Sequence, residues 1–235
     1  MTALLYTFVI VVGYLFGSVC SAVIVSQLFS LPDPRTEGSK NPGATNVLRL
    51  AGKKYAAIVL LGDMLKGLLP VLLAKILGAD HVAICFTALA AVIGHMYPVF
   101  FRFHGGKGVA TALGALLGVN FILGVMVIAT WLLVANFTRY SSLASIVSII
   151  LAPIYAMLAI GHLEIFPPLF FITLLVIYQH RNNITRLIDG EEPKIKASHN
   201  LNEEINAVLT EPTRVVSPAT EEQADEAKET ENKET

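Results

Sequence analysis

Charged residues are scarce in this 235-residue sequence. Asp, Glu, Lys and Arg together make up 15% of it, whereas soluble domains carry about 25%. Hydrophobic residues make up 54%, and the mean hydropathy is +0.63. Residues 1–32 contain no charge at all, a stretch longer than the ~20 apolar residues that a helix needs to cross a bilayer. Composition therefore argues against a soluble protein and predicts an integral membrane protein.

Cysteine and early basic residues are scarce as well. The only cysteines, Cys20 and Cys85, both lie in apolar runs, which predicts neither a disulfide framework nor a cysteine metal site. No two histidines have the i, i+4 spacing of a helical metal site. A cleaved signal peptide needs a basic segment before its apolar stretch, and residues 1–3 supply none. We therefore expect the first apolar run to remain as a membrane span, and we predict no metal.

Acidic residues gather at the end of the chain. Residues 199–235 contain ten acidic and three basic residues, which leaves 14 basic and 8 acidic residues in the remainder. The ending EEQADEAKETENKET has no aromatic residue and little to bury, a composition typical of disordered segments. We expect a membrane domain over 1–198 and an acidic, disordered cytoplasmic tail over 199–235.

The distribution of apolar runs and basic residues predicts the number of membrane crossings. The runs fall at 3–29, 55–77, 82–101, 108–137, 142–160 and 165–179. The fourth run is either one long helix or two short ones that turn near 118–120. Lys and Arg accumulate on the cytoplasmic side of a membrane, and only seven spans put all twelve loop Lys and Arg residues between 31 and 196 on one side. We therefore predict an all-α integral membrane protein with seven transmembrane helices, the N-terminus outside and the C-terminus in the cytoplasm.

The second span contains two charged residues. Asp63 and Lys66 lie three residues apart and hence on one helix face. Such a pair must face the helix bundle, either as a structural ion pair or as part of a site. The sequence leaves both alternatives open.

Two polar loops on the predicted cytoplasmic side have the residues of anion-binding sites. The first, EGSKNPGATNVLRL at 37–50, places Arg49 about one turn into the next helix. The second, FHGGKGVAT at 103–111, surrounds Lys107 with glycines directly before a helix. Glycine backbones and helix N-termini bind anions, although the G-x-x-x-x-G-K-[ST] spacing of a nucleotide-binding loop is absent.

A third polar loop, HRNNITRLIDGEEPKIK at 180–196, lies on the same predicted side. It places His180, Asn183 and Arg186 at three-residue steps along one helix face. Each loop alone has an ordinary explanation, such as a surface turn, a snorkelling lysine or an interfacial histidine. Three such loops on one membrane face together predict a shared anionic site.

The three loops also resemble the signature motifs of a known family. GSKNPGATN with Arg49, GHMYPVFFRFHGGKGVAT and HRNNITRLIDGEEPK resemble those of the bacterial acyl-phosphate:glycerol-3-phosphate acyltransferases, the PlsY family, over residues 4 to about 196. GDMLKG at 62–67 and RYSSLASI at 139–146 fit the same pattern. The sequence departs from it in GSVCSA, where Gly-Ser-Ile-Pro is more usual, and in its longer acidic tail.

The resemblance implies a membrane enzyme of phospholipid synthesis. It implies seven helices in the bacterial inner membrane, with the active site at the cytoplasmic face. The implied reaction transfers a fatty acyl group from acyl phosphate to the 1-hydroxyl of glycerol 3-phosphate, giving lysophosphatidic acid and phosphate. Membrane lipid and the soluble enzyme that makes acyl phosphate are the implied partners, with no cofactor and no nucleic acid.

The resemblance also implies two sets of site residues. The catalytic set is Ser39, Arg49, Lys107, His180 and Asn183, and the substrate-binding set is Gly38, Asn41, Gly43, Thr45, Asn46, Gly105, Gly106, Ser142, Ser145 and Glu192. Acyl phosphate is already activated, so positioning and charge stabilisation can supply most of the catalysis. Either His180 or the phosphate of the donor could take the proton of the attacking hydroxyl.

Two other functions are compatible with parts of the sequence. A transporter or channel for small phosphorylated anions also needs basic loops and broken helices, but no half-repeat is visible and the basic groups collect at one face. A scaffold that recruits partners through the tail explains none of the three loops. Acyl transfer is therefore the favoured prediction.

Overall fold

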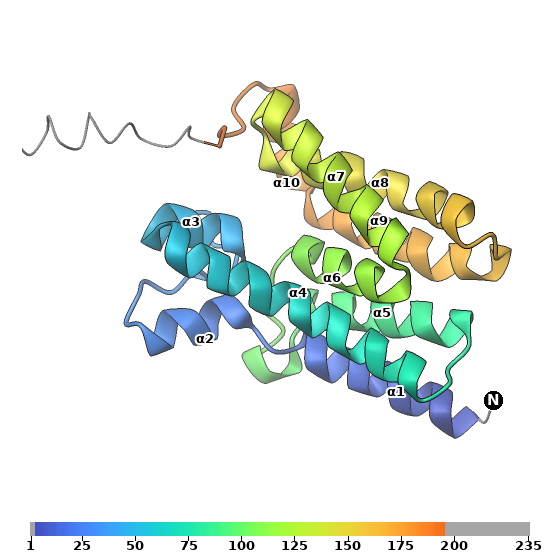
Figure 1. The fold of residues 1–235 in the computed structure, drawn as a ribbon. Coiled ribbons are helices and arrows are strands. Elements are labelled where there is room, and N and C mark those ends of the chain that lie inside the picture. Colours follow the sequence, from blue (N-terminus) through green and yellow to red (C-terminus); the bar gives the residue numbers. More distant parts are fainter. Residues whose placement is uncertain (1–2, 196–235) are drawn as a thin grey trace, which may run out of the picture. The chain divides into compact units, whose positions relative to one another are not determined.

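The apolar runs of the sequence form helices in the structure (Figure 1). Lipid offers no hydrogen-bond partners to a backbone, and a helix satisfies its polar main-chain groups internally. The structure is a computed structural model that describes residues 3–195, and every regular element within that range is helical. The predicted tail over 199–235 and the predicted domain boundary at 198 lie outside the described residues.

Five segments are long and apolar enough to cross a membrane. They are α4 (Lys53–Ile76), α5 (His81–Met96) with η1 (Val99–Phe101), α7 (Phe121–Thr138), α8 (Ser141–Ala159), and the broken pair of α1 (Ala3–Gly17) and α2 (Ser21–Leu28). A sixth results if η2 (Leu163–Ile165), α9 (Phe166–Gln179) and α10 (Arg181–Ile188) count as one span, although the chain bends by 59° between α9 and α10. The described residues thus contain five or six candidate spans, against the seven predicted.

The difference lies in α6 (Val109–Val119), which has only 11 residues. Eleven helical residues rise about 16 Å, roughly half the thickness of a hydrocarbon core. The predicted run 108–137 therefore forms two helices, with a turn at Asn120. The Asn120 side chain accepts a hydrogen bond from the N–H of Leu123 (3.0 Å) and caps the start of α7.

The first span is broken between α1 and α2, where the sequence predicts one continuous run. The break leaves the Val19 carbonyl without a helical partner, and the Lys66 ammonium donates to it (2.7 Å). Lys66 also pairs with Asp63 (2.8 Å), and both side chains are buried. The two charges on α4 thus form an ion pair that also stabilises the bend in the neighbouring span.

Small residues allow α4 and α6 to pack backbone against backbone. A Cβ atom on Gly114 would lie 1.9 Å from the Met64 carbonyl oxygen, and one on Gly67 would lie 2.1 Å from the Thr111 carbonyl oxygen. Close packing of this kind is a main source of helix association within lipid. It holds the first turn of α6, and the glycine-rich loop before it, against the middle of α4.

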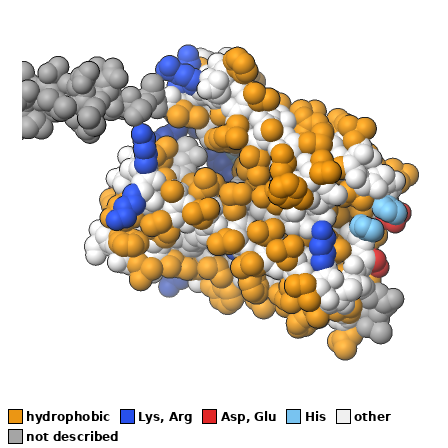
Figure 2. Space-filling view, viewed as in Figure 1, with side chains coloured by type: hydrophobic (Ala, Val, Ile, Leu, Met, Phe, Trp, Pro, Cys, Tyr) orange, Lys and Arg blue, Asp and Glu red, His pale blue; other side chains and the backbone are white. Residues whose placement is uncertain are grey.

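The helices expose apolar side chains outward. Leu61, Phe137 and Leu158 are among the large hydrophobic residues on the surface, and Figure 2 shows hydrophobic side chains over much of the visible face. Soluble monomers rarely expose apolar patches of this extent. The surface is therefore suited to lipid.

Candidate functional site

A cavity of about 570 Å³ lies where the three polar loops of the sequence meet. Helices far apart in the chain contribute to its wall, including the start of α3 (Ala44–Ala51), the middle of α4, the start of α8 and the end of α9. Its polar lining residues include Ser39, Asn41, Thr45, Asn46, Arg49, Asp63, His95, Lys107, Ser141, Ser142, Ser145, Gln179, His180, Asn182, Asn183, Arg186 and Glu192. The fold thus brings basic and hydroxyl groups from the three loops and from the start of α8 to one place.

Three of the fifteen predicted site residues do not line this cavity: Gly38, Gly105 and Gly106. The N–H of Gly106 donates to the carbonyl of His95 (3.1 Å), and a Cβ on Gly105 would lie 2.0 Å from the same oxygen. Gly38 has a φ of +62°, and a Cβ there would lie 2.4 Å from the Asn46 side chain. These glycines therefore permit close packing behind the cavity wall, and the remaining predicted residues line it.

The first loop is held by the side chain of Asn46, which is 1% exposed. Its amide nitrogen donates to the carbonyls of Pro34 and Glu37 (both 3.0 Å), and its oxygen accepts from the N–H of Ser39 (2.9 Å). Three hydrogen bonds from one buried amide fix the loop against the start of α3. Asn46 therefore shapes the loop and presents Ser39 to the cavity.

Three helices begin at the cavity wall. The first residues of α3, α6 and α8 line it, around Gly43, Gly108 and Ser141 respectively. None of these three helices has a side-chain cap in the structure. The first N–H groups of a helix have no intrahelical partner and carry a partial positive charge, which makes such ends binding sites for anions.

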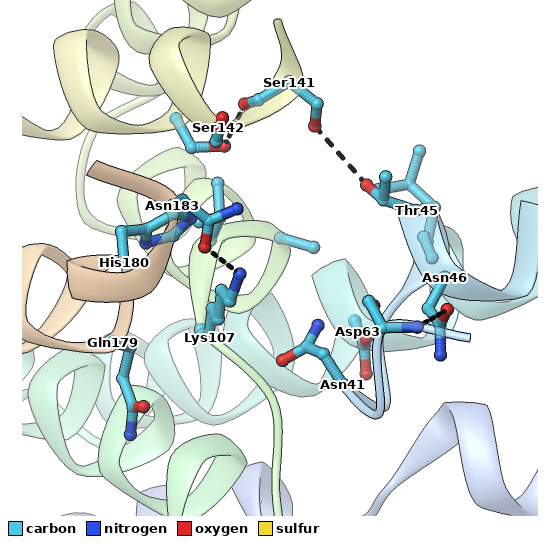
Figure 3. Close-up of a pocket in the computed structure, with 18 of the residues that line it drawn as sticks. Asn41, Thr45, Asn46, Asp63, Lys107, Ser141, Ser142, Gln179, His180 and Asn183 are labelled. Atoms are coloured by element: carbon cyan, nitrogen blue, oxygen red, sulfur yellow. Dashed lines mark hydrogen bonds between the residues drawn. The ribbon is translucent and has the colours of Figure 1, made fainter. Parts of the chain in front are cut away.

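A chain of hydrogen bonds holds Lys107 in the cavity, and Figure 3 shows its first bond, from Lys107 to Asn183. The Lys107 ammonium donates to the side-chain oxygen of Asn183, and the Asn183 amide donates to Glu192 (2.7 Å). The other Glu192 oxygen accepts from Arg186 (2.8 Å). Glu192 therefore orients Asn183 and Arg186, two other residues of the cavity lining.

Burial changes the charge state of the groups around this chain. It lowers the pKa of Lys107 to about 8, an effect that Glu192 opposes and that Arg186 and Arg49 add to. For Glu192, burial raises the pKa, but the neighbouring Ser142 hydroxyl and the hydrogen bonds from Asn183 and Arg186 outweigh it and leave the pKa below its usual value. Glu192 is therefore an anion near neutral pH, whereas Lys107 titrates within the working range of an enzyme.

His180 follows the last residue of α9 and faces the cavity beside Lys107 (Figure 3). Burial lowers its pKa to about 4, with a smaller contribution from the Lys107 charge. The ring Nδ1 lies 2.8 Å from the Val176 carbonyl, which can only accept, so Nδ1 carries the proton. The neutral ring then presents Nε2 as a hydrogen-bond acceptor.

Sequence reasoning left out several lining residues that lie inside helices. Asp63 on α4 and His95 on α5 reach the cavity, as does Trp131 on α7, whose indole N–H donates to Ser145 (3.1 Å). A polar residue inside a predicted span is the signal that could have identified the first two. Among residues 3–195, no three His, Cys, Asp or Glu side chains lie together as metal ligands would.

One side of the cavity is apolar. It is formed by Leu60 and Met64 of α4, Leu113 of α6, and Ile128 and Leu132 of α7. A mixed lining of this kind suits a ligand with both a charged and a hydrocarbon part.

Comparison with known proteins identifies a family model and relatives that match most of the described chain. Residues 7–190 match the family model of glycerol-3-phosphate acyltransferase. A glycerol-3-phosphate acyltransferase of Legionella pneumophila is 67% identical over 201 residues, covering 86% of this chain and 73% of that protein. One from Methylococcus capsulatus is 52% identical over 185 residues, covering 79% and 93%.

A solved structure is similar throughout the fold. It is the crystal structure of PlsY (YgiH), an integral membrane glycerol 3-phosphate acyltransferase, in its glycerol 3-phosphate form. The TM-score is 0.77 at 42% identity, and the match covers 81% of this chain and 96% of that one. The lysophosphatidic acid form of the same protein matches with a TM-score of 0.74.

Proposed function

Since the chain belongs to the glycerol-3-phosphate acyltransferase family, we propose that its cavity holds two phosphate-bearing substrates and passes an acyl group between them. The protein is an integral membrane enzyme that acylates glycerol 3-phosphate. The proposed donor is acyl phosphate, and the proposed products are lysophosphatidic acid and inorganic phosphate. The family assignment decides against a transporter of phosphorylated anions.

The convergence of three helix N-termini on one cavity carries this proposal. The starts of α3, α6 and α8 supply free N–H groups, and Arg49, Lys107 and Arg186 supply full positive charges. A single phosphate monoester would be neutralised by only some of these N–H groups and cations. Two phosphates, together with the charge that moves onto one of them during the reaction, would use the whole set. The apolar side formed by α4, α6 and α7 is suited to the fatty chain of a lipid-like donor.

The reaction needs no covalent enzyme intermediate. The 1-hydroxyl oxygen of glycerol 3-phosphate attacks the acyl carbon, the bond from that carbon to the phosphate oxygen breaks, and the departing phosphate takes the hydroxyl proton. Lys107 and Arg49 stabilise the charge that moves onto that phosphate. Neutral His180 accepts a hydrogen bond through Nε2 from the other hydroxyl of glycerol 3-phosphate, which holds the attacking 1-hydroxyl in line and leaves its proton to the phosphate.

The proposed membrane arrangement has seven crossings, with the N-terminus outside and the cavity open to the cytoplasm of the bacterial inner membrane. Three helix pairs, α4 with α5, α6 with α7 and α8 with α9, leave the cavity region and return to it, which supports an even number of crossings after the first span. The cytoplasmic side is supported by the basic residues that follow each return. We place the catalytic domain at 1–198, the acidic tail at 199–235, and the soluble enzyme that makes acyl phosphate as a partner on that side.

A matched pair of variants tests the proposed site. Lys107→Met removes a buried cation from the cavity, and we expect kcat with acyl phosphate to fall by about 10²-fold or more, as for loss of a preorganised charge. Lys75→Met makes the same change at an exposed residue in the last turn of α4, outside the cavity, and should leave kcat unchanged. Purified protein in detergent is assayed with saturating glycerol 3-phosphate and either acyl phosphate or acyl-CoA.

Two results would contradict the proposal. Near-normal activity of Lys107→Met would show that the glycine-rich loop is an ordinary turn without a role in catalysis. Turnover with acyl-CoA as efficient as with acyl phosphate would reject the donor assignment.

A further inference from the structure

Four polar side chains are buried together behind the glycine-rich loop. Asp63 and Lys66 come from α4, His95 from α5 and Thr111 from α6, and they are 2%, 6%, 5% and 0% exposed. Lys66 pairs with Asp63 (2.8 Å), Thr111 Oγ1 lies 3.0 Å from His95 Nδ1, and that nitrogen lies 3.7 Å from Asp63. Buried polar groups are costly to leave unpaired, so a cluster that links three helices fixes their relative positions closely.

His95 contacts the chain on both sides of Lys107. Before Lys107, the N–H of Gly106 donates to the His95 carbonyl (3.1 Å), and a Cβ on Gly106 would lie 2.3 Å from the ring Nε2. After Lys107, the Thr111 hydroxyl in the first turn of α6 bonds to the ring Nδ1. The loop therefore lies directly on one histidine, which touches its backbone and the helix that follows.

The loop depends on contacts with His95 because few contacts within the loop itself hold its conformation. Gly105, Gly106 and Gly108 flank Lys107 without side chains that could pack, and glycine loses more conformational freedom on folding than any other residue. The position of the Lys107 ammonium along the cavity therefore depends on what holds the glycines. A displacement of about 1 Å at a catalytic group can cost up to 10²-fold in rate.

We propose that His95, fixed by Thr111 and by the Asp63–Lys66 pair, is a positioning residue that sets Lys107 against the phosphates of the substrates. The inference rests on the proposed role of Lys107 and extends it to residues that act through the loop that carries Lys107. Thr111 does not line the cavity, so its contribution passes through His95 and the loop.

The substitution Thr111→Val tests this role because it keeps the shape of the side chain and replaces the hydroxyl with a methyl group of similar size. We expect kcat/KM for glycerol 3-phosphate to fall about tenfold, within the range for a misplaced catalytic group. Thr111→Ser keeps the hydroxyl and should restore activity. Thr87→Val is the matched control, since Thr87 is equally buried and, within residues 3–195, its hydroxyl bonds only to the carbonyl of Ala83 in its own helix (2.8 Å).

A second background separates positioning from general stability. In Lys107→Met, the added Thr111→Val should cause no further loss, because the group that it positions is gone. A purely structural role would lower activity by the same factor in both backgrounds, and that result would overturn the inference. Equal activity of Thr111→Val and Thr87→Val would overturn it too.

The design also distinguishes this inference from the proposed function. If Lys107→Met alone keeps its activity, the proposed role of Lys107 fails, and this inference fails with it. If Lys107→Met is inactive and Thr111→Val matches its control, only the inference fails. Should the valine variants not accumulate in the membrane, Thr111→Ala and Thr87→Ala provide the same comparison.

Discussion

Burial lowers the pKa of Lys107 into a pH range in which an exposed lysine stays charged. With its pKa lowered to about 8, the free enzyme loses the Lys107 charge as the pH rises through that value. We expect kcat/KM for glycerol 3-phosphate, which reports on free enzyme, to fall along an alkaline limb near pH 8. Lys107→Arg retains its charge to much higher pH. Its profile, measured from about pH 6 to about pH 10, should lack that limb even where its maximal rate is lower.

His180 provides the acid-side control for the same measurement. Burial lowers its pKa to about 4, so the ring is neutral throughout the range and too weak a base to drive deprotonation. His180→Gln should therefore raise the KM for glycerol 3-phosphate and leave the acid side of the profile unchanged. A collapse of kcat at saturating substrate, with loss of an acid limb, would instead identify His180 as the base.

The polar segments between apolar runs could be predicted as site candidates, whereas the sequence left open the role of polar residues inside the long apolar helices. Arg49, Lys107 and His180 lie in polar segments between apolar runs, and such segments are visible in a sequence. Asp63 and His95 lie within runs that are otherwise apolar, and their direction depends on how α4 and α5 pack. The role of Gly105 and Gly106 as contacts for His95 depends in the same way on tertiary packing.

At the scale of helices, the crossing of α4 and α6 positions the start of α6. Gly114→Ala would place a Cβ 1.9 Å from the Met64 carbonyl oxygen, so α6 must move away from α4. We expect a loss of stability of about 1–3 kcal/mol, as for other overpacked contacts, together with reduced activity because Lys107 precedes α6. Thermal unfolding in detergent, followed by the fluorescence of Trp131, measures the first effect and the acyltransferase assay the second.

The control for this helix crossing is Gly78→Ala. Gly78 has a φ of +74° with nothing within 4 Å of a Cβ, so the substitution should cost about 1–2 kcal/mol of backbone strain and no activity. Equal activity of the two variants would show that the position of α6 does not depend on Gly114.

The helices themselves were largely predictable, but their breaks were less so. Long apolar runs gave α4, α5, α7 and α8 to within a few residues, and glycines with Asn120 indicated the turn between α6 and α7. The bend between α1 and α2 was not predicted, because it depends on Lys66 from another helix bonding the Val19 carbonyl. The number of crossings also stays a prediction, since 11-residue α6 is short for a span.

For the whole molecule, the seven-span arrangement makes a direct prediction about access. Cysteine in place of exposed His104 should react with a membrane-impermeant thiol reagent only from the cytoplasm, and cysteine in place of exposed His162 only from outside. The native Cys20 and Cys85 are buried and should give little background. Labelling of both engineered cysteines from the same side would contradict the odd number of crossings, α6, α7 and α8, that the arrangement places between residues 104 and 162.

The chain of Lys107, Asn183 and Glu192 has a consequence for biogenesis. Ribosomal synthesis delivers Lys107 to the membrane first, while the residues that hold its ammonium follow more than seventy positions later. Until α10 and the segment after it emerge, a nascent protein with its first six helices inserted has a buried lysine without its amide and carboxylate partners. We therefore expect catalytic competence only once the chain has been synthesised beyond Glu192, and a product interrupted before that residue should occupy the membrane without consuming acyl donor.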